Sequence, residues 1–235
     1  MNQSTVSNHH VNSKISPWLV RLVYPLGSRI VVPLFFGRLT ITGEENIPKT
    51  GPVIVAPTHR SRWDALIVPY SVGRRTSGRD LRFMVTSSEM KGIQGWFISR
   101  MGGFPIDVKH PGMSTLGYSV TVLKQGEMLV IFPEGGIFRD TQVHPLKRGV
   151  AKIALEVQSQ QPDSGMKILP VSIHYSQPLP SWGTDVTVNI GQPIDIDSYD
   201  TQKIRSSSET LTDDLESSLK EVHQGKNSSQ ELAIA

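Results

Sequence analysis

His59 and Asp64 are the two residues whose types and spacing most constrain the chemistry of this chain. Histidine has an unperturbed pKa near neutrality, so its imidazole can take a proton from an alcohol at working pH. A carboxylate placed shortly after the histidine can bind the N–H of the ring nitrogen that does not react, which fixes the tautomer and stabilises the imidazolium. The pair therefore predicts general-base catalysis on a hydroxyl group. The H-x-x-x-x-D pattern alone is a weak signal, because ordinary polar residues at a helix start also produce it.

The surrounding residues predict where this pair lies. An apolar run of strand length, residues 53–56, is closed by Pro57, and a second apolar run, residues 65–68, follows Asp64. This order predicts a strand that passes into a helix, with His59 in the connection. In open α/β sheets, ligands bind at the carboxyl ends of the strands. We therefore expect His59 at a ligand-binding edge of a sheet.

A second cluster repeats the same arrangement. The apolar run 129–132 leads into a turn that contains Glu134, Gly135, Gly136 and Arg139. Glycine allows positive φ and a close approach of the backbone to a ligand, and arginine offers a planar fork suited to phosphate oxygens. The alternative interpretation is a tight turn with a surface arginine.

These residues resemble the PlsC-type glycerolipid acyltransferases, the best known of which are 1-acyl-glycerol-3-phosphate acyltransferases. Four ordered blocks carry the resemblance, and together with weaker matches they cover about residues 38–197. The blocks are His59 with Asp64, the stretch 102–109 around Gly-Gly-Phe-Pro-Ile, the stretch 132–139 beginning Phe-Pro-Glu-Gly, and the strand-like stretch 168–173 with its Pro-Val pair.

The chain departs from the family pattern at the cationic positions. Gly136 and Ile137 stand where the third block usually has threonine and arginine, so Arg139 is the arginine that remains. The second block usually carries an arginine, and here Lys109 is the nearby cation. A lysine neutralises a phosphate as a point charge, without the bidentate fork of arginine. The departures put the identity of the acceptor in question more than the chemistry.

The resemblance implies a function and a set of site residues. It implies transfer of a fatty acyl group from a thioester, on acyl carrier protein or coenzyme A, to a lysophospholipid, foremost 1-acyl-sn-glycerol 3-phosphate, giving phosphatidic acid. His59 and Asp64 would be catalytic. The substrate-binding residues would be Glu134, Gly135 and Gly136 in the acceptor pocket, Arg139 and Lys109 on the phosphate, and Pro170 on the acyl-donor side.

Several alternatives stay open at this point. The acceptor could be glycerol 3-phosphate or another lysolipid, and the chain could be a non-catalytic membrane scaffold. Pro170 is equally well explained as a proline at a bulge in an edge strand. A covalent route would want a serine near His59, and Ser61 is the nearest in sequence, although capping of the following helix is its expected role. The absence of cysteine and of an H-x-x-x-H pair argues against a metal, and acyl transfer from a thioester needs no cofactor.

The charge distribution indicates an anionic surface as a partner. Residues 1–43 contain four basic residues and no acidic one. Such a surface is either lipid or nucleic acid, and the chain has no aromatic-basic RNA motif or recognition-helix pattern. Apolar residues around Trp18 and Phe35 favour lipid. Arg21 and Pro25 are among the residues that interrupt the apolar run, so no stretch approaches the roughly 20 residues of a membrane span.

The expected fold is α/β, a largely parallel sheet flanked by helices and preceded by an amphipathic two-helix membrane motif. We expect a polar leader (1–16), the membrane motif (17–37, with helices at 17–24 and 26–36), an acyltransferase domain (38–223) and a tail (224–235), peripheral or monotopic on a cytoplasmic membrane face. The alternative for the motif is a helical hairpin packed on the domain. Expected strands are 38–42, 53–56, 82–86, 104–107, 128–132, 167–174 and 185–190. Expected helices are 63–72, 91–100, 113–125, 149–160 and 209–223.

Overall fold

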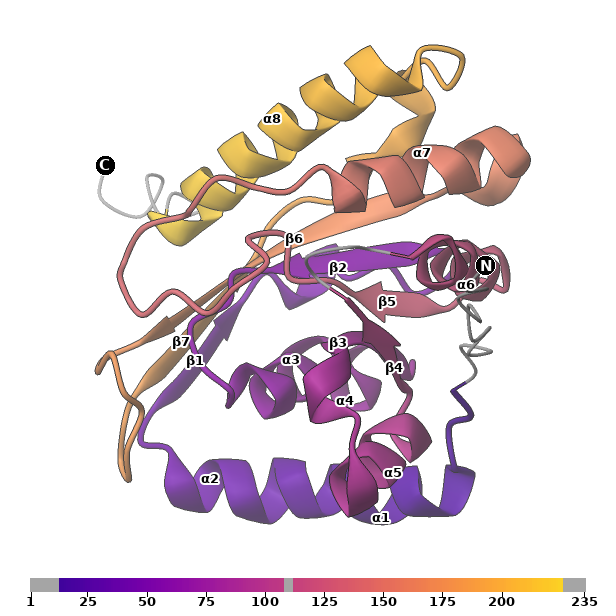
Figure 1. Cartoon of the computed structure of the whole chain (residues 1–235). Coiled ribbons are helices and arrows are strands. Elements are labelled where there is room, and N and C mark those ends of the chain that lie inside the picture. Colours follow the sequence, from indigo (N-terminus) through magenta and orange to yellow (C-terminus); the bar gives the residue numbers. More distant parts are fainter. Residues whose placement is uncertain (1–12, 108–111, 226–235) are drawn as a thin grey trace, which may run out of the picture.

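The computed structural model describes residues 13–107 and 112–225, and its centre is an eight-stranded sheet (Figure 1). The strand order is β1-β7-β6-β2-β5-β3-β4, and β8 pairs with β6 beside β7. The strands are β1 (Leu39–Thr42), β2 (Val53–Pro57), β3 (Leu81–Thr86), β4 (Gly103–Ile106), β5 (Met128–Val130), β6 (Lys167–Tyr175), β7 (Val186–Ile190) and β8 (Ile194–Asp195). All seven strands expected from the sequence are present; β8 was not expected.

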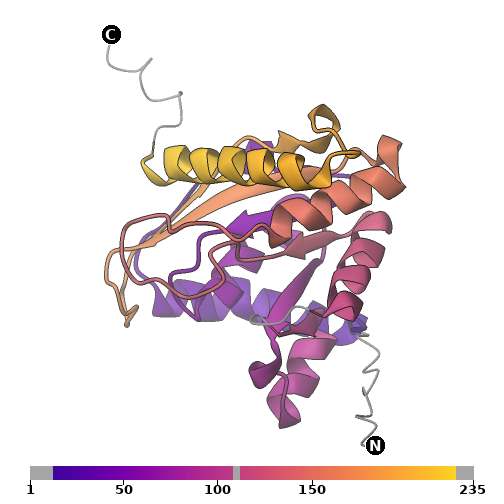
Figure 2. The same ribbon diagram turned by 45° about the horizontal axis from the view of Figure 1, so that its top comes forward.

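Helices cover both faces of the sheet (Figures 1 and 2). On one face lie α6 (Met113–Lys124), α7 (Gly149–Gln160) and α8 (Ile204–His223), which pack on one another in that order. On the other face lie α1 (Pro17–Leu26), α2 (Val32–Phe35), α3 (Asp64–Val72), α4 (Arg74–Ser77) and α5 (Gly92–Arg100). The predicted α/β architecture with a mostly parallel sheet is confirmed.

The central strands are apolar along their whole length because both of their faces are covered. Every residue of β2 is buried. Ile54 and Ala56 belong to the core beneath α6, α7 and α8, whereas Val53 and Val55 belong to the core beneath α3. The alternation follows from the period of two along a strand. The sequence therefore fixes β2 at the middle of the sheet, and its carboxyl end is where His59 begins.

Two strand pairs are antiparallel, β6 with β7 and β6 with β8. Parallel neighbours need a crossover of a dozen or more residues. The connection from Tyr175 to Val186 is shorter than that and closes as a hairpin. The remaining pairs, including β2 with both β5 and β6, are parallel. The carboxyl ends of β2, β5 and β6 consequently lie together at one edge of the sheet.

The amino-terminal segment differs from the expected pair of helices. Residues 17–35 form one continuous helix, in which a π-helical segment, Gly27–Val31, joins α1 to α2. A proline removes an N–H and its ring crowds the carbonyl four residues earlier. The wider π turn, closed by the Val32 N–H on the Gly27 carbonyl, precedes Pro33 and accommodates it. The prolines thus distort the helix without ending it.

Apart from shifts of one residue at several ends, three further elements differ from those expected. Helix α8 begins at Ile204, five residues before the predicted start at Glu209. The prediction missed its first turns because they are rich in serine and give little apolar periodicity. Strand β5 ends at Val130, so Ile131 and Phe132 already belong to the connection. The short helix α4 lies in a stretch whose turn-forming residues predict a loop.

Candidate active site

The turn between β2 and α3 brings His59 and Asp64 into contact. The ring Nδ1 of His59 lies 2.8 Å from Oδ2 of Asp64. Asp64 is the first residue of α3, which begins directly after the turn. Because an ionised carboxylate only accepts hydrogen bonds, Nδ1 carries the proton and Nε2 has a free lone pair. The imidazole is therefore held in the tautomer of a general base.

Asp64 is fully buried, and protein groups surround its carboxylate. Oδ2 also accepts the backbone N–H groups of Arg60 at 2.7 Å and Ser61 at 2.9 Å, and Oδ1 accepts the hydroxyl of Tyr175 at 2.6 Å. Burial, and then the charge of Asp64, raise the pKa of Tyr175 far above its ordinary value, so the phenol stays a donor at any working pH. Four donors thus fix this carboxylate beneath the imidazole.

The His59 ring is partly exposed, with 19% of its side chain accessible, and it stacks on Phe132. The two ring centroids are 3.8 Å apart and the planes are inclined by 18°. Phe132 follows β5, the parallel neighbour of β2. The two motifs therefore meet at one edge of the sheet, as expected from the sequence, and the aromatic ring holds one face of the imidazole.

Glu134 lies in a different place from the one the sequence suggested. Its carboxylate is buried and forms a two-pronged ion pair with Arg60, at 2.9 Å to Nη1 and 3.0 Å to Nη2. It also accepts the backbone N–H of His59 at 2.8 Å and of His144 at 3.0 Å. With these contacts Glu134 holds the two motifs together behind the imidazole. Glu134 is not among the residues that line the cavity beside His59, and its expected role in shaping the acceptor pocket stays a prediction.

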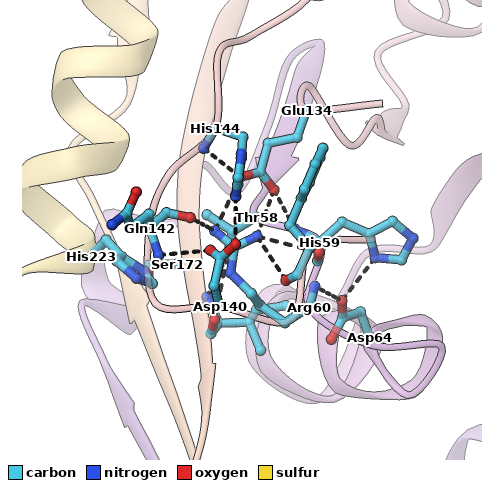
Figure 3. A network of polar contacts seen from close by, with 12 residues as sticks. Thr58, His59, Arg60, Asp64, Glu134, Asp140, Gln142, His144, Ser172 and His223 are labelled. Atoms are coloured by element: carbon cyan, nitrogen blue, oxygen red, sulfur yellow. Dashed lines mark hydrogen bonds and ion pairs between the residues drawn. The ribbon is translucent and has the colours of Figure 1, made fainter. Parts of the chain in front are cut away.

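The connection from β5 to α7, residues 131–148, is tied to the same network (Figure 3). Arg60 donates to the carbonyl of Gln142 at 2.6 Å. Further along, His223 of α8 donates from Nε2 to the carbonyl of Thr141 at 2.9 Å and accepts the hydroxyl of Ser172 at Nδ1. Burial lowers the pKa of His223, which favours this neutral form. The connection is therefore held from β2, β6 and α8 together.

His59 lines a cavity of about 1130 Å³. This exceeds the roughly 300–1,000 Å³ of ordinary small-molecule pockets. Most of the lining is apolar. The walls come from α3, β3, α5, the 131–137 stretch and the inner face of the amino-terminal helix, with Val20, Val23, Tyr24, Gly27, Ser28 and Val32 from that helix. The amino-terminal helix is thus a wall of the cavity. The alternative of a hairpin packed on the domain is wrong in its hairpin, since the segment is one helix, but the inner face of this helix does face the domain.

The two predicted glycines line the cavity beside His59. Gly135 has a φ of 71°, a conformation that a side chain rarely adopts, and Gly136 follows it in the wall. Arg139 is exposed and is not part of the wall, and its side chain forms no hydrogen bond or ion pair with any residue in the described ranges. Lys109 lies outside the described residues. The phosphate roles expected for these two cations stay predictions, and the position of Arg139 speaks against its own.

Pro170 lies in the interior of the sheet. Its strand, β6, is paired with β2 on one side, so the edge-strand interpretation is wrong. On the other side its carbonyl accepts the N–H of Gly191, in the connection between β7 and β8. Pro170 lies between the part of β6 that pairs with β8 and the part that pairs with β7. Its missing N–H is therefore at a gap between these two strands. Pro170 does not line the cavity, and a role on the donor side stays a prediction.

Ser61 and possible metal ligands also bear on the chemistry of the site. The Ser61 hydroxyl accepts the N–H of Trp63 at 3.3 Å, in the turn before α3. No side chain caps α3, so the capping role expected for Ser61 is wrong. Within residues 13–107 and 112–225, no three histidine, aspartate or glutamate side chains are placed to hold a metal ion together.

Sequence reasoning missed the partners that hold His59 and Asp64 in place. Arg60 stands beside His59 in sequence, but its ion pair reaches Glu134 in another motif. Tyr175 is 111 positions from Asp64 and belongs to β6. One signal was available for Arg60, since a basic residue in one strand-end motif and an acid in the other can pair where neighbouring strands end. No local pattern indicated Tyr175.

Fold and site together define an α/β protein in which an oriented histidine lines a mostly apolar cavity. The chain belongs to the acyltransferase family, whose pattern matches residues 38–174. It is 31% identical to a 1-acyl-sn-glycerol-3-phosphate acyltransferase of Streptococcus pneumoniae, over 61% of this chain and 50% of that protein. It is 30% identical to the protein of that name from Bacillus subtilis, over 50% of this chain and 57% of that protein. The chain thus spans about half the length of these relatives.

A solved structure shares the fold. The crystal structure of the 1-acyl-sn-glycerophosphate acyltransferase PlsC from Thermotoga maritima matches 88% of this chain and 80% of that one, with a TM-score of 0.59 and 24% identity. The PlsC-type resemblance inferred from the four blocks is confirmed by the family match and by these relatives.

Proposed function

We propose that this protein is an O-acyltransferase of phospholipid synthesis. It moves a fatty acyl group from an acyl thioester to the free hydroxyl of a lysophospholipid, foremost 1-acyl-sn-glycerol 3-phosphate, giving phosphatidic acid. One observation carries the proposal, the oriented His59–Asp64 pair facing an apolar cavity of about 1130 Å³. The relatives from Streptococcus pneumoniae and Bacillus subtilis bear the name of this activity.

The geometry supports direct transfer in a ternary complex. Nε2 of His59 takes the proton of the acceptor hydroxyl while its oxygen attacks the thioester carbonyl. The resulting tetrahedral centre collapses, the C–S bond breaks, and the thiol leaves with the proton from the imidazolium. Asp64 stabilises the imidazolium while it exists. A covalent acyl-enzyme is not needed, because a thiolate is already a good leaving group.

The apolar cavity suits the acyl chains of donor and acceptor. Its wall beside His59 is the Gly135–Gly136 turn, where the absence of side chains lets a glycerol backbone approach the base. The donor is an acyl thioester of either acyl carrier protein or coenzyme A. Glycerol 3-phosphate is the alternative acceptor, since a 74-residue stretch is also 38% identical to a yeast glycerol-3-phosphate O-acyltransferase.

An apolar face suits attachment to a membrane. Five large side chains on the outer side of the amino-terminal helix recur at every fourth position and are exposed: Trp18, Leu22, Leu26, Ile30 and Leu34. Helix α5, which carries the exposed side chains of Ile93 and Trp96, lies near one end of this helix (Figure 1). At the other end, the ring of exposed Trp182, in the β6–β7 hairpin, lies 6.0 Å from that of Phe35.

The attachment we propose is peripheral or monotopic, on anionic lipid at the cytoplasmic face. Among the described residues, the helix 17–35 alone is long and apolar enough to cross a membrane, contrary to the expectation that its interruptions would prevent this. Its inner face lines the cavity, however, so the helix lies along the domain and presents its apolar outer face. Arg21 and Arg29 on the same helix supply charge for lipid headgroups.

An acceptor and donor panel tests the proposal. The purified protein is given lysophosphatidate, glycerol 3-phosphate or a lysophospholipid without a phosphomonoester, each with acyl carrier protein and coenzyme A thioesters, and products are identified by mass spectrometry. We expect phosphatidic acid as the major product. Absence of acyl transfer to every acceptor with both donors would contradict the proposal.

A further inference from the structure

We propose that Lys147 binds the phosphate of the acceptor lipid and that this amine makes the site selective for acceptors with a phosphomonoester. The inference rests on the proposed function and adds the residue that selects the acceptor. Of the two cations expected from the sequence, Arg139 is exposed and does not line the cavity, and Lys109 lies outside the described residues. The cation for a phosphate-bearing acceptor is therefore sought among the described residues that line the cavity with His59.

Lys147 lies beside the turn that adjoins the base. A Cβ atom placed on Gly135 would come within 2.7 Å of the Lys147 Nζ and 2.6 Å of its Cε, so the aliphatic stem and amine occupy the space left by the glycine. The Lys147 backbone N–H binds the carbonyl of Pro133 at 2.9 Å, which holds the residue against the turn. Phe132, whose ring stacks on His59, is at the start of the same turn. Lys147 and His59 both line the cavity.

The charge of Lys147 is available to a ligand. Within residues 13–107 and 112–225, its amine forms no hydrogen bond or ion pair with the protein. Glu89 is the one acidic residue among the described residues that line the cavity, and it is paired with Arg62. Two other basic residues of the wall, Arg74 and Arg75, are paired with carboxylates as well. Lys147 is an exposed residue that also lines the cavity, and its amine is a cation without a counter-ion among the described residues.

Two further cations, which have no ion-pair partner in the part of the chain that the structure describes, line the cavity from another element. Arg21 and Arg29 belong to the amino-terminal helix, whereas Lys147 is held against the Gly135 turn that adjoins His59. In 1-acyl-sn-glycerol 3-phosphate the free hydroxyl and the phosphate are on neighbouring carbon atoms. The cation that binds the phosphate must therefore lie close to the base. Lys147 meets this condition because it lies against Gly135, in the turn that begins with Phe132, and the Phe132 ring stacks on His59.

Variants of Lys147 test the inference on two acceptors that share an acyl chain, lysophosphatidate and monoacylglycerol. Lys147→Ala should raise the KM for lysophosphatidate at least about tenfold, because a charge-assisted hydrogen bond to the phosphate is lost. The KM for monoacylglycerol and for the donor should stay within about twofold. Lys147→Arg should recover most of the loss, since the charge returns.

Arg148→Ala is the matched control, because this neighbouring cation is exposed and paired with Glu209. It should leave both KM values unchanged. An unchanged KM for lysophosphatidate in Lys147→Ala would overturn the inference, as would an equal loss on both acceptors, which indicates a structural role. An increase in KM found in Arg139→Ala instead of Lys147→Ala would overturn it too.

Calorimetric titration separates this inference from the proposed function. Short-chain lysophosphatidate, without any donor, should bind the wild-type protein at least about tenfold more tightly than Lys147→Ala. Should the wild type bind in this way and transfer no acyl group, the proposed function would fail and the phosphate site would stand. Equal affinity of the two proteins for this ligand would overturn the site whatever the activity.

Discussion

At the scale of single residues, Asp64 holds the catalytic histidine through a carboxylate with four donors. The two backbone N–H groups fix the turn, the imidazole uses one oxygen, and the Tyr175 hydroxyl binds the other. A buried acceptor that loses a donor costs about 1–3 kcal/mol. Tyr175 is therefore a positioning residue that acts through Asp64, although its own ring lies outside the cavity wall.

Tyr175→Phe should lower kcat by about tenfold, corresponding to about 1.4 kcal/mol, and leave the acceptor KM nearly unchanged. The free energy of unfolding should fall by about 1–3 kcal/mol. Because the raised pKa keeps the phenol protonated, the pH–rate profile should keep its shape. Steady-state kinetics and urea unfolding measure these effects.

Tyr199→Phe is the control for this substitution, because the Tyr199 hydroxyl also binds a carboxylate, that of Asp214 at 2.7 Å, away from the cavity. It should leave kcat unchanged. Equal kcat values for Tyr175→Phe and the wild type would contradict the positioning role.

At the scale of elements, the connection 131–148 depends on the buried pair of Arg60 and Glu134. Each partner is nearly inaccessible to solvent. Removal of one member of such a pair leaves an uncompensated charge, which typically destabilises a protein by about 3–5 kcal/mol. The same carboxylate binds the backbone of His59, so the position of the base depends on it.

Glu134→Gln should therefore destabilise the protein by about 3 kcal/mol and lower kcat by at least about tenfold. Chemical denaturation and initial rates measure the two effects. Glu209→Gln breaks an exposed pair with Arg148 and should change the stability by less than about 1 kcal/mol. Were Glu134→Gln as stable and active as this control, the buried pair would not hold the site.

The amino-terminal helix lines the cavity with its inner face and exposes apolar side chains on its outer face, so the outer face can be altered separately. Leu22→Gln combined with Ile30→Gln alters the outer face, where both side chains are exposed. We expect weaker sedimentation with anionic vesicles, because apolar area that enters the lipid is lost, and unchanged kcat on a soluble short-chain acceptor. Unchanged sedimentation would show that this face does not contact lipid.

Local patterns in the sequence were sufficient for the strands and for the two motifs. Seven strands follow from apolar runs, and the meeting of the motifs follows from neighbouring strand ends. The single amino-terminal helix could not be predicted, since proline and glycine usually end a helix, and the packing of Val20 and Val32 keeps this one continuous. The burial of Glu134 and the exposure of Arg139 depend on contacts between distant segments, which no local period encodes.

At the scale of the whole molecule, two layers of helices and a sheet place one base between a polar network and an apolar cavity. The network of Asp64, Arg60 and Glu134 lies behind the imidazole and fixes it. The cavity lies before it, with one wall from the helix whose outer face is apolar. This arrangement suits a reaction between a hydroxyl and a thioester that both carry acyl chains.

The rate of acyl transfer by His59→Ala tests the central claim most directly. Phosphatidic acid and free thiol are measured with lysophosphatidate and the better thioester donor, and circular dichroism verifies that the variant is folded. We predict a fall in kcat on the order of 10²- to 10⁴-fold, the usual contribution of a general base, with a nearly unchanged KM for the acceptor. A folded His59→Ala protein that turns over within about twofold of the wild type would contradict the assignment of His59 as the base.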